Sequence, residues 1–495
     1  MTSAPVVVLD NGASTIKASL QHGQSSDDFR IIPNAIVRSK GDRKTYFGHE
    51  LAQCRDYSSL HYRLPFERGY LTDWDAQKAV WDGVFSSEVL GVNTSESALL
   101  ITEPPFNLSN IQDVYDQFVF EEYEFQSYFR CTRPSLSTRR FPSANDLDSN
   151  LAASLVPHGD LFTGNGGVPP ECMLIVDSGF SFTHSIPVMN GVVFWKGVKR
   201  PAFIVRRSVH AADHQVRPLR LDVGGKLLTN HLKELVSFRQ WNMMDETYIV
   251  NDVKESCCYV SNSFKDDLEI CQTNPKRNGI LREYVLPDFS ANRKGRVKQE
   301  NDILADSDQV LFMNNERFAV PELLFRPSEI GLDQGGIADT IARSIACLPE
   351  DLQGMFWANI GLVGGNVKFA GFRERLMSEL RSLAPVDCSV HIYESSSPIT
   401  EAHRAGVEFA CSPAFAREAV TRAEYLECGS NACRRKFKDW RSTDREEQKE
   451  REREVDRTKH TKPKGKTRAN DDETRKKLSR TRTKSTTKRV SRTMA

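Results

Sequence analysis

The chain contains one short pattern twice: an apolar, strand-like run that ends in aspartate, a small polar residue and glycine. The two copies are residues 6–12 and residues 173–179, and their aspartates, Asp10 and Asp177, lie 167 residues apart. Each run has the length and apolar character of a buried strand, and each ends in a turn signal. The repeat indicates an internal duplication, with one copy in each of two lobes that alternate strands and helices.

The turns offer groups that bind phosphate and magnesium. Glycine permits a tight turn whose N–H groups face an anion, and a strand-end aspartate can hold a hydrated Mg²⁺. Across a cleft, the two turns would clamp the phosphates of a nucleotide, with Lys17 reaching a phosphate oxygen. A third turn, at Gly364 and Gly365 after residues 360–363, would let the backbone approach a flat ring or a ribose. Neither of the common glycine-rich phosphate loops is present.

Hydrophobic periodicity predicts the elements between these turns. Helices are predicted at residues 75–85, 111–129, 227–238 and 248–264, strands at 99–102 and 360–363, and polar loops at 276–308. The length of 495 residues favours two or more domains or one large bilobed body.

Composition divides the chain into five segments. They are residues 1–140, 141–171 (a mobile insertion), 172–411 (with a second insertion at 196–217), 412–433 and 434–495 (a basic disordered tail).

The net charge of +1 is divided unevenly between body and tail. Residues 434–495 hold 24 basic and 11 acidic side chains, which leaves 43 basic and 55 acidic in residues 1–433. The tail therefore carries +13 and the body −12. Residues 459–492 are a candidate for nuclear import and for contact with DNA phosphates, and the alternative is a solvated tail that only aids solubility or import.

Other functional classes are disfavoured. The N-terminus has no basic region before its apolar run, so no signal peptide is expected, and no stretch approaches the length of a membrane span. The eleven cysteines form no CxxC pair, and they are expected to be reduced, ordinary thiols.

Several segments resemble actin and the actin-related proteins over most of residues 5–411. They are residues 69–75 (Gly-Tyr-Leu-Thr-Asp-Trp-Asp), Thr102-Glu103-Pro104, Asp177-Ser178-Gly179, Leu221-Asp222-Val223-Gly224-Gly225 and Asn315-Glu316-Arg317-Phe318. The resemblance implies an α/β fold of two lobes, built from duplicated ribonuclease-H-like domains of the actin-like ATPase type, around a nucleotide cleft. It assigns residues 1–140 to the first part of the small lobe, residues 172–411 to the large lobe and its return segments, and residues 412–433 to the C-terminal end of the body.

Further segments are similar to the actin-related proteins of nuclear chromatin remodellers. They are residues 64–66, 120–123, 181–184, 226–234, 245–247 and 284–289. The resemblance implies a non-filamentous scaffold subunit, nuclear and also cytoplasmic, of an ATP-dependent complex that exchanges the Z variant of histone two-A and affects transcription and chromosome stability. The implied partners are a remodelling ATPase subunit, a zinc-HIT-type subunit and nucleosomal DNA or histones, with no membrane.

The resemblance also implies ATP or ADP with Mg²⁺ as a structural ligand in the cleft, and the alternative is that the cleft is empty. The matching contact residues are Asp10, Asn11, Gly12, Lys17, Asp177, Ser178, Gly179, Lys254, Glu255, Gly364, Gly365 and Phe369. The metal would be held by Asp10 and Asp177.

Departures from actin predict negligible hydrolysis and no catalytic residue. Ala13 and Ser14 stand where actin has serine and glycine, and Phe180 stands where actin has a further aspartate. Residues 131–134 contain no counterpart of the glutamine that places the attacking water in actin. Without that partner, His184 is assigned to packing or hydrogen bonding. Losing several such groups leaves slow phosphoryl transfer or none.

Residues 38–48 run straight through the region where actin has a longer, mobile subunit-joining loop, which predicts that the chain does not polymerise. The loop could also have been shortened for stability alone. Two other functions stay open at this point: a slow actin-like ATPase and a cytoskeletal actin-related protein.

Overall fold

The computed structural model describes residues 4–23, 28–132, 172–189, 192–195, 199–200, 217–218, 220–291 and 293–437. The chain divides into two units, residues 1–440 and 441–495, and all described elements lie in the first. The insertion predicted at 141–171, most of that at 196–217, and the tail beyond residue 437 lie outside the described residues.

The first large sheet has the strand order β22-β10-β9-β1-β2-β3. Its strands are β1 (Val6–Asn11), β2 (Thr15–Gln21), β3 (Arg30–Pro33), β9 (Ala98–Glu103), β10 (Ser127–Thr132) and β22 (Val420–Thr421). β1 is buried along its whole length, as its continuous apolar run predicts. It pairs antiparallel with β2, which places Asp10 opposite Lys17, and parallel with β9.

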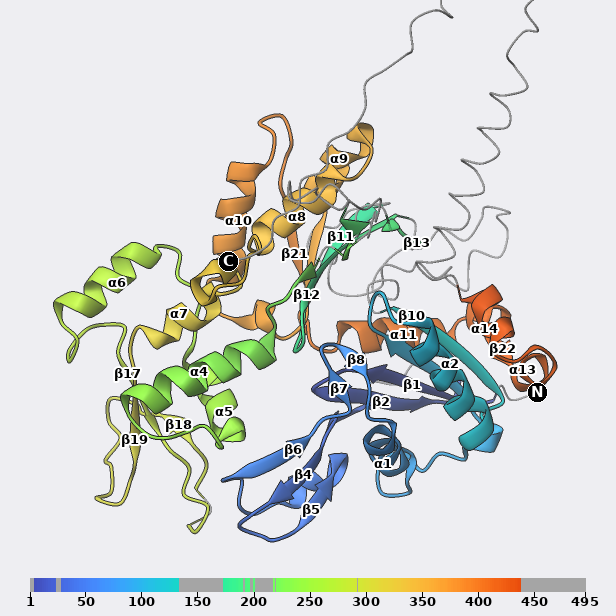
Figure 1. Ribbon diagram of the computed structural model, residues 1–495, viewed down its shortest axis with the longest axis horizontal. Helices are drawn as coiled ribbons and strands as arrows, with labels where there is room; N and C mark the ends of the chain where they lie inside the picture. Colours follow the sequence, from blue (N-terminus) through green and yellow to red (C-terminus); the bar gives the residue numbers. More distant parts are fainter. Residues whose placement is uncertain are drawn as a thin grey trace, which may run out of the picture. The chain divides into compact units, whose positions relative to one another are not determined.

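The second large sheet repeats this arrangement (Figure 1). Its strands are β11 (Cys172–Ser178), β12 (Thr183–Met189), β13 (Val192–Val193), β16 (Arg220–Leu221), β20 (Ile360–Val363) and β21 (Ile392–Glu394). β11 pairs antiparallel with β12 and parallel with β20, as β1 pairs with β2 and β9. The two similar sequence patterns thus occupy equivalent positions in two similar sheets.

Helices complete both lobes. Those of the first lobe are α1 (Trp74–Phe85), α2 (Ser109–Gln117), α11 (Glu401–Cys411), α12 (Pro413–Glu418), α13 (Arg422–Cys428) and α14 (Ser430–Lys436). Those of the second are α4 (Gly225–Arg239), α5 (Thr247–Cys257), α6 (Phe264–Thr273), α7 (Glu316–Glu322), α8 (Ile337–Ala346), α9 (Glu350–Trp357) and α10 (Phe372–Leu383). Local signals set their ends: the Asp73 side chain, for example, caps α1 by accepting from the Ala76 N–H.

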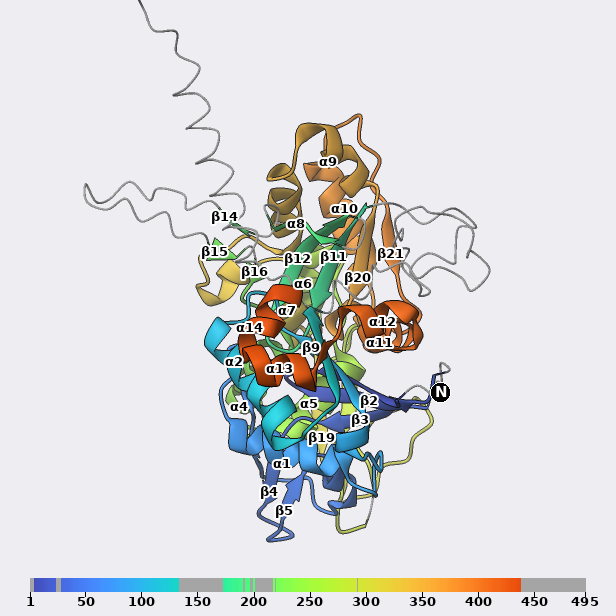
Figure 2. The ribbon, with the colours of Figure 1, turned by 90° about the vertical axis from the view of Figure 1, so that its right-hand side faces the viewer.

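The last helices return to the first lobe. α11 packs on β1 and β2, and α14 packs on α2, which Figure 2 shows beside α13 and α14. β22 pairs with β10 at the edge of the first sheet. Tyr128 and Val420, which are 292 positions apart in the sequence, are therefore paired in one sheet.

Smaller sheets extend each lobe. They are β4 (Ile36–Ser39) with β5 (Thr45–Phe47) and β6 (Leu60–Arg63), β7 (Phe66–Glu67) with β8 (Tyr70–Leu71), β14 (Lys199–Arg200) with β15 (Arg217–Pro218), and β17 (Arg282–Val285) with β18 (Arg296–Val297) and β19 (Val310–Met313). Short helical turns are η1 (Gly48–Gln53), η2 (Thr94–Glu96), η3 (Phe118–Glu122), η6 (Pro327–Ile330) and η7 (Asn366–Lys368).

Three predicted elements were wrong in part. Residues 111–129 do not form one helix, because α2 passes into a π-helical turn and the chain then enters β10, whose aromatic side chains are buried in the sheet. The helix predicted at 248–264 ends at Cys257 in α5, and α6 begins anew at Phe264. The predicted loop at 276–308 contains β17 and β18, which β19 stabilises by pairing with β17.

The boundary predicted at residue 434 is also too early. α14 continues to Lys436, and Phe437 is buried against the rings of Tyr128 and Phe129, each at 5.5 Å between centroids. Phe437 was overlooked in the sequence because it stands within a run of basic residues.

Candidate functional site

The turns of both lobes line one cavity of about 660 Å³. This volume lies in the range of small-molecule and cofactor sites. Eleven of the twelve predicted contact residues border it: Asp10, Asn11, Gly12, Lys17, Asp177, Gly179, Lys254, Glu255, Gly364, Gly365 and Phe369. The exception is Ser178.

Asp10 and Lys17 form a buried pair at the first turn. The Lys17 Nζ lies 3.6 Å from one Asp10 oxygen, and the Thr102 hydroxyl donates to the other at 2.7 Å. Thr102 also accepts the backbone N–H of Asn11 at 3.1 Å, which ties β9 to the turn. The cation beside the cavity could attract an anion, whereas the Asp10 carboxylate is already held by two protein groups.

The side chain of Asn11 points away from the cavity into the lobe. Its amide nitrogen donates to the hydroxyl of Tyr115 at 3.1 Å and lies 3.5 Å from the Gln77 amide oxygen. The indole N–H of Trp81 donates to its amide oxygen at 3.5 Å. Asn11 therefore borders the cavity, while its side chain holds the first turn in place through hydrogen bonds inside the lobe.

Ser178 is buried behind the second turn. Its hydroxyl lies 2.8 Å from that of Thr183, and Asn366 donates to it at 3.2 Å and to the Gly179 carbonyl at 2.8 Å. The serine hydroxyl thus cross-links the second and third turns. Thr183 on β12 and Asn366 on η7 turn the Ser178 hydroxyl away from the cavity, and the sequence around Ser178 does not show these contacts.

Gly364 is required where the third turn meets the second. Its φ is +98°, and a Cβ there would lie 2.3 Å from the Ser178 carbonyl oxygen. A side chain would be strained and would clash with backbone. The glycine therefore permits the two turns to lie against each other.

Lys254 borders the cavity with its ammonium already engaged. The Nζ donates to the Thr229 hydroxyl and the Asn251 amide oxygen, both at 2.9 Å, and lies 3.4 Å from the Gly225 carbonyl. Burial lowers the pKa of this ammonium. Lys254 thus ties α5 to the first turn of α4, while Glu255 accepts from Asn251 at 2.8 Å.

The predicted departures lie at the cavity itself. Ala13, Ser14 and Phe180 all border it, and His184 does so as well. Of residues 131–134, the last two lie outside the described residues. The sequence interpretation missed Arg220, whose guanidinium lies over the Phe182 ring at 4.0 Å and which also borders the cavity. No motif marked it, because its place on β16 depends on pairing with β12.

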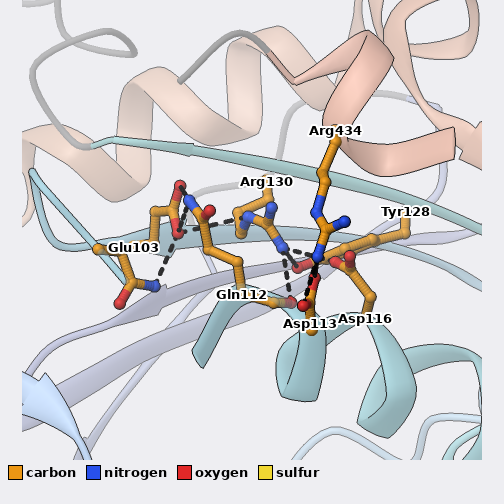
Figure 3. A network of polar contacts seen from close by, with 8 residues as sticks. Glu103, Gln112, Asp113, Asp116, Tyr128, Arg130 and Arg434 are labelled. Atoms are coloured by element: carbon orange, nitrogen blue, oxygen red, sulfur yellow. Dashed lines mark hydrogen bonds and ion pairs between the residues drawn. The ribbon is translucent and has the colours of Figure 1, made fainter. Parts of the chain in front are cut away.

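A buried ion cluster connects the cavity wall to the last helix (Figure 3). Glu103 borders the cavity and lies 3.3 Å from the Arg130 Nε, and Arg130 contacts Asp116 at 2.5 Å. Burial raises the pKa of Asp116 to about 6, although Arg130 opposes that shift. On the outer side, Arg434 of α14 donates to Asp113 of α2 at 2.6 Å.

The cavity fits a nucleotide in size and in the placement of its groups. Lys17 and the glycine turns suit phosphates, and Phe369 with the third turn suits a flat ring. For a cation, only the carboxylates of Asp10 and Asp177 were predicted, and within the described ranges no group of three or more His, Cys, Asp or Glu side chains gathers as a metal site.

Comparison with known families decides the family. The family model named Actin matches residues 1–438. The chain belongs to the actin family. Its α/β architecture with two equivalent sheets is the bilobed fold that the sequence predicted. None of the helices in the described segments combines the length and the apolar character needed to cross a membrane.

Within the actin family, the chain is similar to proteins named actin-related protein 6. It is 43% identical to actin-like protein ARP6 of Cryptococcus neoformans, over 88% of this chain and 85% of that protein. It is 35% identical to actin-related protein 6 of Drosophila melanogaster, over 86% and 97% of the two chains. The protein of that name in Arabidopsis thaliana is 34% identical, over 87% and 99%.

Proposed function

We propose that this protein is a non-filamentous scaffold subunit of a nuclear ATP-dependent chromatin remodeller, which exchanges the Z variant of histone two-A into nucleosomes. The proposal rests on its likeness to proteins named actin-related protein 6 and on the resemblance carried by residues 226–234 and 284–289. Transcription and chromosome stability would be affected through the complex. The protein would act in the nucleus and also be found in the cytoplasm.

Phe180 carries the argument against catalysis. It borders the cavity where actin has a carboxylate, so the cation would have to be held by Asp10 and Asp177. The Asp10 carboxylate is already engaged by Lys17 and Thr102. A site that is poorer in free carboxylates holds Mg²⁺ less rigidly and stabilises the transferring phosphoryl group less. Hydrolysis is therefore proposed to be negligible.

ATP or ADP would act as a structural ligand in this cavity. Lys17 and the turns at Gly12 and Gly179 would hold the phosphates, and the third turn with Phe369 would hold the base. When bound, the nucleotide supplies binding free energy to the folded body alone, because both lobes must be formed to contact it.

The β4–β5 hairpin supports the absence of self-polymerisation. Its short turn is fastened by Asp42, which accepts from the Tyr46 hydroxyl at 2.8 Å and from the Arg55 N–H at 3.0 Å. Because the turn between β4 and β5 is short and held by contacts within its own sheet, it provides no long segment that could bind a neighbouring subunit. The proposed partners are instead a remodelling ATPase subunit and a zinc-HIT-type subunit, with residues 459–492 available to nucleosomal DNA or histones.

Nucleotide content and turnover of the purified full-length protein test the cavity's role. The protein is denatured, any released nucleotide is identified, and phosphate release is followed with Mg²⁺ present. Bound nucleotide with turnover no faster than that of an Asp177→Asn variant is expected. Turnover well above that variant would contradict the scaffold proposal and favour a slow ATPase, for which Lys17 and His184 at the cavity are the supporting observation.

Association is tested with tagged protein in nuclear extract. We expect the full chain to co-purify with a remodelling ATPase and a zinc-HIT-type subunit in comparable amounts, and to sediment as a monomer when purified alone under actin-polymerising salt. Filaments in that salt, or purification free of any remodeller subunit, would contradict the proposal.

A further inference from the structure

Two buried amides, Asn34 and Gln77, lie directly beneath the first turn. Both side chains are 0% exposed, and Asn34 comes from the connection between β3 and β4 while Gln77 comes from α1. Neither was identified in the sequence, and neither borders the cavity. Buried amides are costly unless their hydrogen bonds are made, so their partners indicate what they do.

Asn34 holds both ends of the turn. Its side-chain nitrogen donates to the Gly12 carbonyl at 2.8 Å, and its backbone N–H donates to the Ser14 carbonyl at 2.8 Å. One residue thus fixes the orientation of two peptide groups on either side of Ala13.

Gln77 fixes Asn34 in turn. Its amide nitrogen donates to the Asn34 amide oxygen at 3.1 Å, and its amide oxygen accepts from the Asn34 nitrogen at 3.3 Å. This reciprocal pair determines which way the Asn34 amide faces, because the opposite orientation would place like groups against each other. Asn11 also lies 3.5 Å from the Gln77 oxygen, which joins the strand end to the pair.

Because the peptide group is planar, the hydrogen bond from Asn34 to the Gly12 carbonyl also sets the direction of the Ala13 N–H at the cavity. In a trans peptide the C=O of one residue and the N–H of the next point in opposite directions. When Asn34 holds the Gly12 carbonyl inward, the Ala13 N–H must point outward, and Ala13 borders the cavity. In the part of the chain that the structure describes, this N–H donates to no other group.

We infer that Asn34 and Gln77 are positioning residues of a phosphate-binding turn: their amide pair holds the Gly12 carbonyl inward and thereby aims the Ala13 N–H at a phosphate oxygen. This inference rests on the proposed nucleotide site. It also explains how the turn can keep one shape although Ala13 and Ser14 replace the serine and glycine of actin.

Three variants of comparable burial separate positioning from stability. Asn34→Ala removes the side-chain grip on Gly12, and Gln77→Met removes its support while keeping most of the volume. Ser97→Ala is the control, because Ser97 is 1% exposed and the substitution removes a hydrogen bond in the same lobe, to the Asn93 carbonyl at 2.7 Å, that does not involve the turn. Each is compared with the wild type after bound nucleotide has been stripped from the full-length protein.

The probes are ATP, inorganic tripolyphosphate and adenosine, measured by equilibrium binding. Loss of one oriented hydrogen bond to a charged group corresponds to about tenfold in affinity. Asn34→Ala is expected to weaken ATP and tripolyphosphate about tenfold and adenosine less than about twofold. Gln77→Met should show the same pattern to a smaller extent, and Ser97→Ala should leave all three affinities unchanged.

The outcomes distinguish the inference from the proposed function. If the wild type binds ATP and Asn34→Ala binds it equally well, the inference is wrong and the nucleotide site stands. Equal losses for adenosine and tripolyphosphate would show general disruption of the cavity and would also overturn the inference. If the wild type binds none of the three probes, the proposed nucleotide site fails and the inference fails with it.

Discussion

The Glu246 carboxylate accepts hydrogen bonds from both the backbone N–H and the hydroxyl of Ser59, at 3.0 Å and 3.1 Å, across 187 positions of sequence. Ser59 has a φ of 48°, a left-handed conformation that a serine rarely adopts. Beside this contact the rings of Tyr57 and Tyr248 stack at 4.4 Å. Together these contacts join the sheet of β4, β5 and β6 to α5, the helix that carries Lys254 at the cavity wall.

Replacing Glu246 with alanine should loosen this connection. Loss of two hydrogen bonds to a partly exposed carboxylate is expected to lower the free energy of unfolding by about 1 kcal/mol. Amide hydrogen exchange in residues 56–63 should rise, and bound nucleotide should dissociate faster. Asp245→Ala is the matched control, because Asp245 makes an exposed ion pair with Lys40 at 3.8 Å. Unchanged exchange in Glu246→Ala would contradict the prediction.

Replacing Gly364 with alanine adds only one methyl group, but it should lower both the stability of the protein and its affinity for nucleotide. A positive φ at a non-glycine residue costs about 1–3 kcal/mol, and the added Cβ also meets the Ser178 carbonyl. We expect a lower melting temperature and weaker nucleotide binding. Gly365→Ala is the neighbour for comparison, since its Cβ would meet nothing within 4 Å. The prediction is wrong if the two alanine variants behave alike.

Asp116 should make the body more stable in mild acid. Its pKa is raised by burial from an ordinary 3.8 to about 6, so the folded state binds a proton that the unfolded state has lost. The contribution of this group is present below pH 4 and is lost as the pH rises to about 6, with an upper limit of about 3 kcal/mol. Urea titrations of wild type and Asp116→Asn between pH 4 and 7 should therefore differ in slope. Parallel curves would exclude this pKa.

His403 should have the opposite effect to Asp116, because it should make the protein less stable as the pH falls. Burial lowers the pKa of its imidazole to about 4, against the pull of Asp10, and Ser19 is its hydrogen-bond partner at 3.0 Å. Because the unfolded imidazole binds a proton first, stability is present above pH 6.5 and is lost as the pH falls toward 4. His403→Gln should flatten the wild-type curve in this window. A variant that loses stability as steeply as the wild type on acidification would show that His403 is not responsible.

Two truncations test where the body ends. Deleting residues 438–495 leaves the described packing intact and should not change the melting temperature. Deleting from Ser430 removes Phe437 from Tyr128 and Phe129, and removes Arg434 from Asp113. Loss of a buried aromatic typically costs about 3–5 kcal/mol, so this protein should unfold at a clearly lower temperature. Equal melting temperatures would place the end of the body before Ser430.

The features that could be predicted from the sequence are those set by residues close together in the chain. The strands before Asp10 and Asp177, and the glycine turns after them, follow from apolar runs and turn residues within a few positions. Ser178 was misplaced because its hydroxyl is turned by Thr183 and Asn366, which reach it from other elements. Asn34 and Gln77 were missed for the same reason, since two ordinary amides 43 positions apart have no shared pattern until the fold brings them together.

The place of β22 beside β10 has a consequence for how the protein is made. The ribosome synthesises β10 early, but β22, which pairs with the first two residues of β10, is produced about 290 residues later. Until then the backbone of Ser127 and Tyr128 lies at an unpaired sheet edge of the kind that can pair with other chains. The lobe that is translated first is therefore completed only after the second lobe has been made, and we expect the nascent chain to be most prone to aggregation before β22 is synthesised.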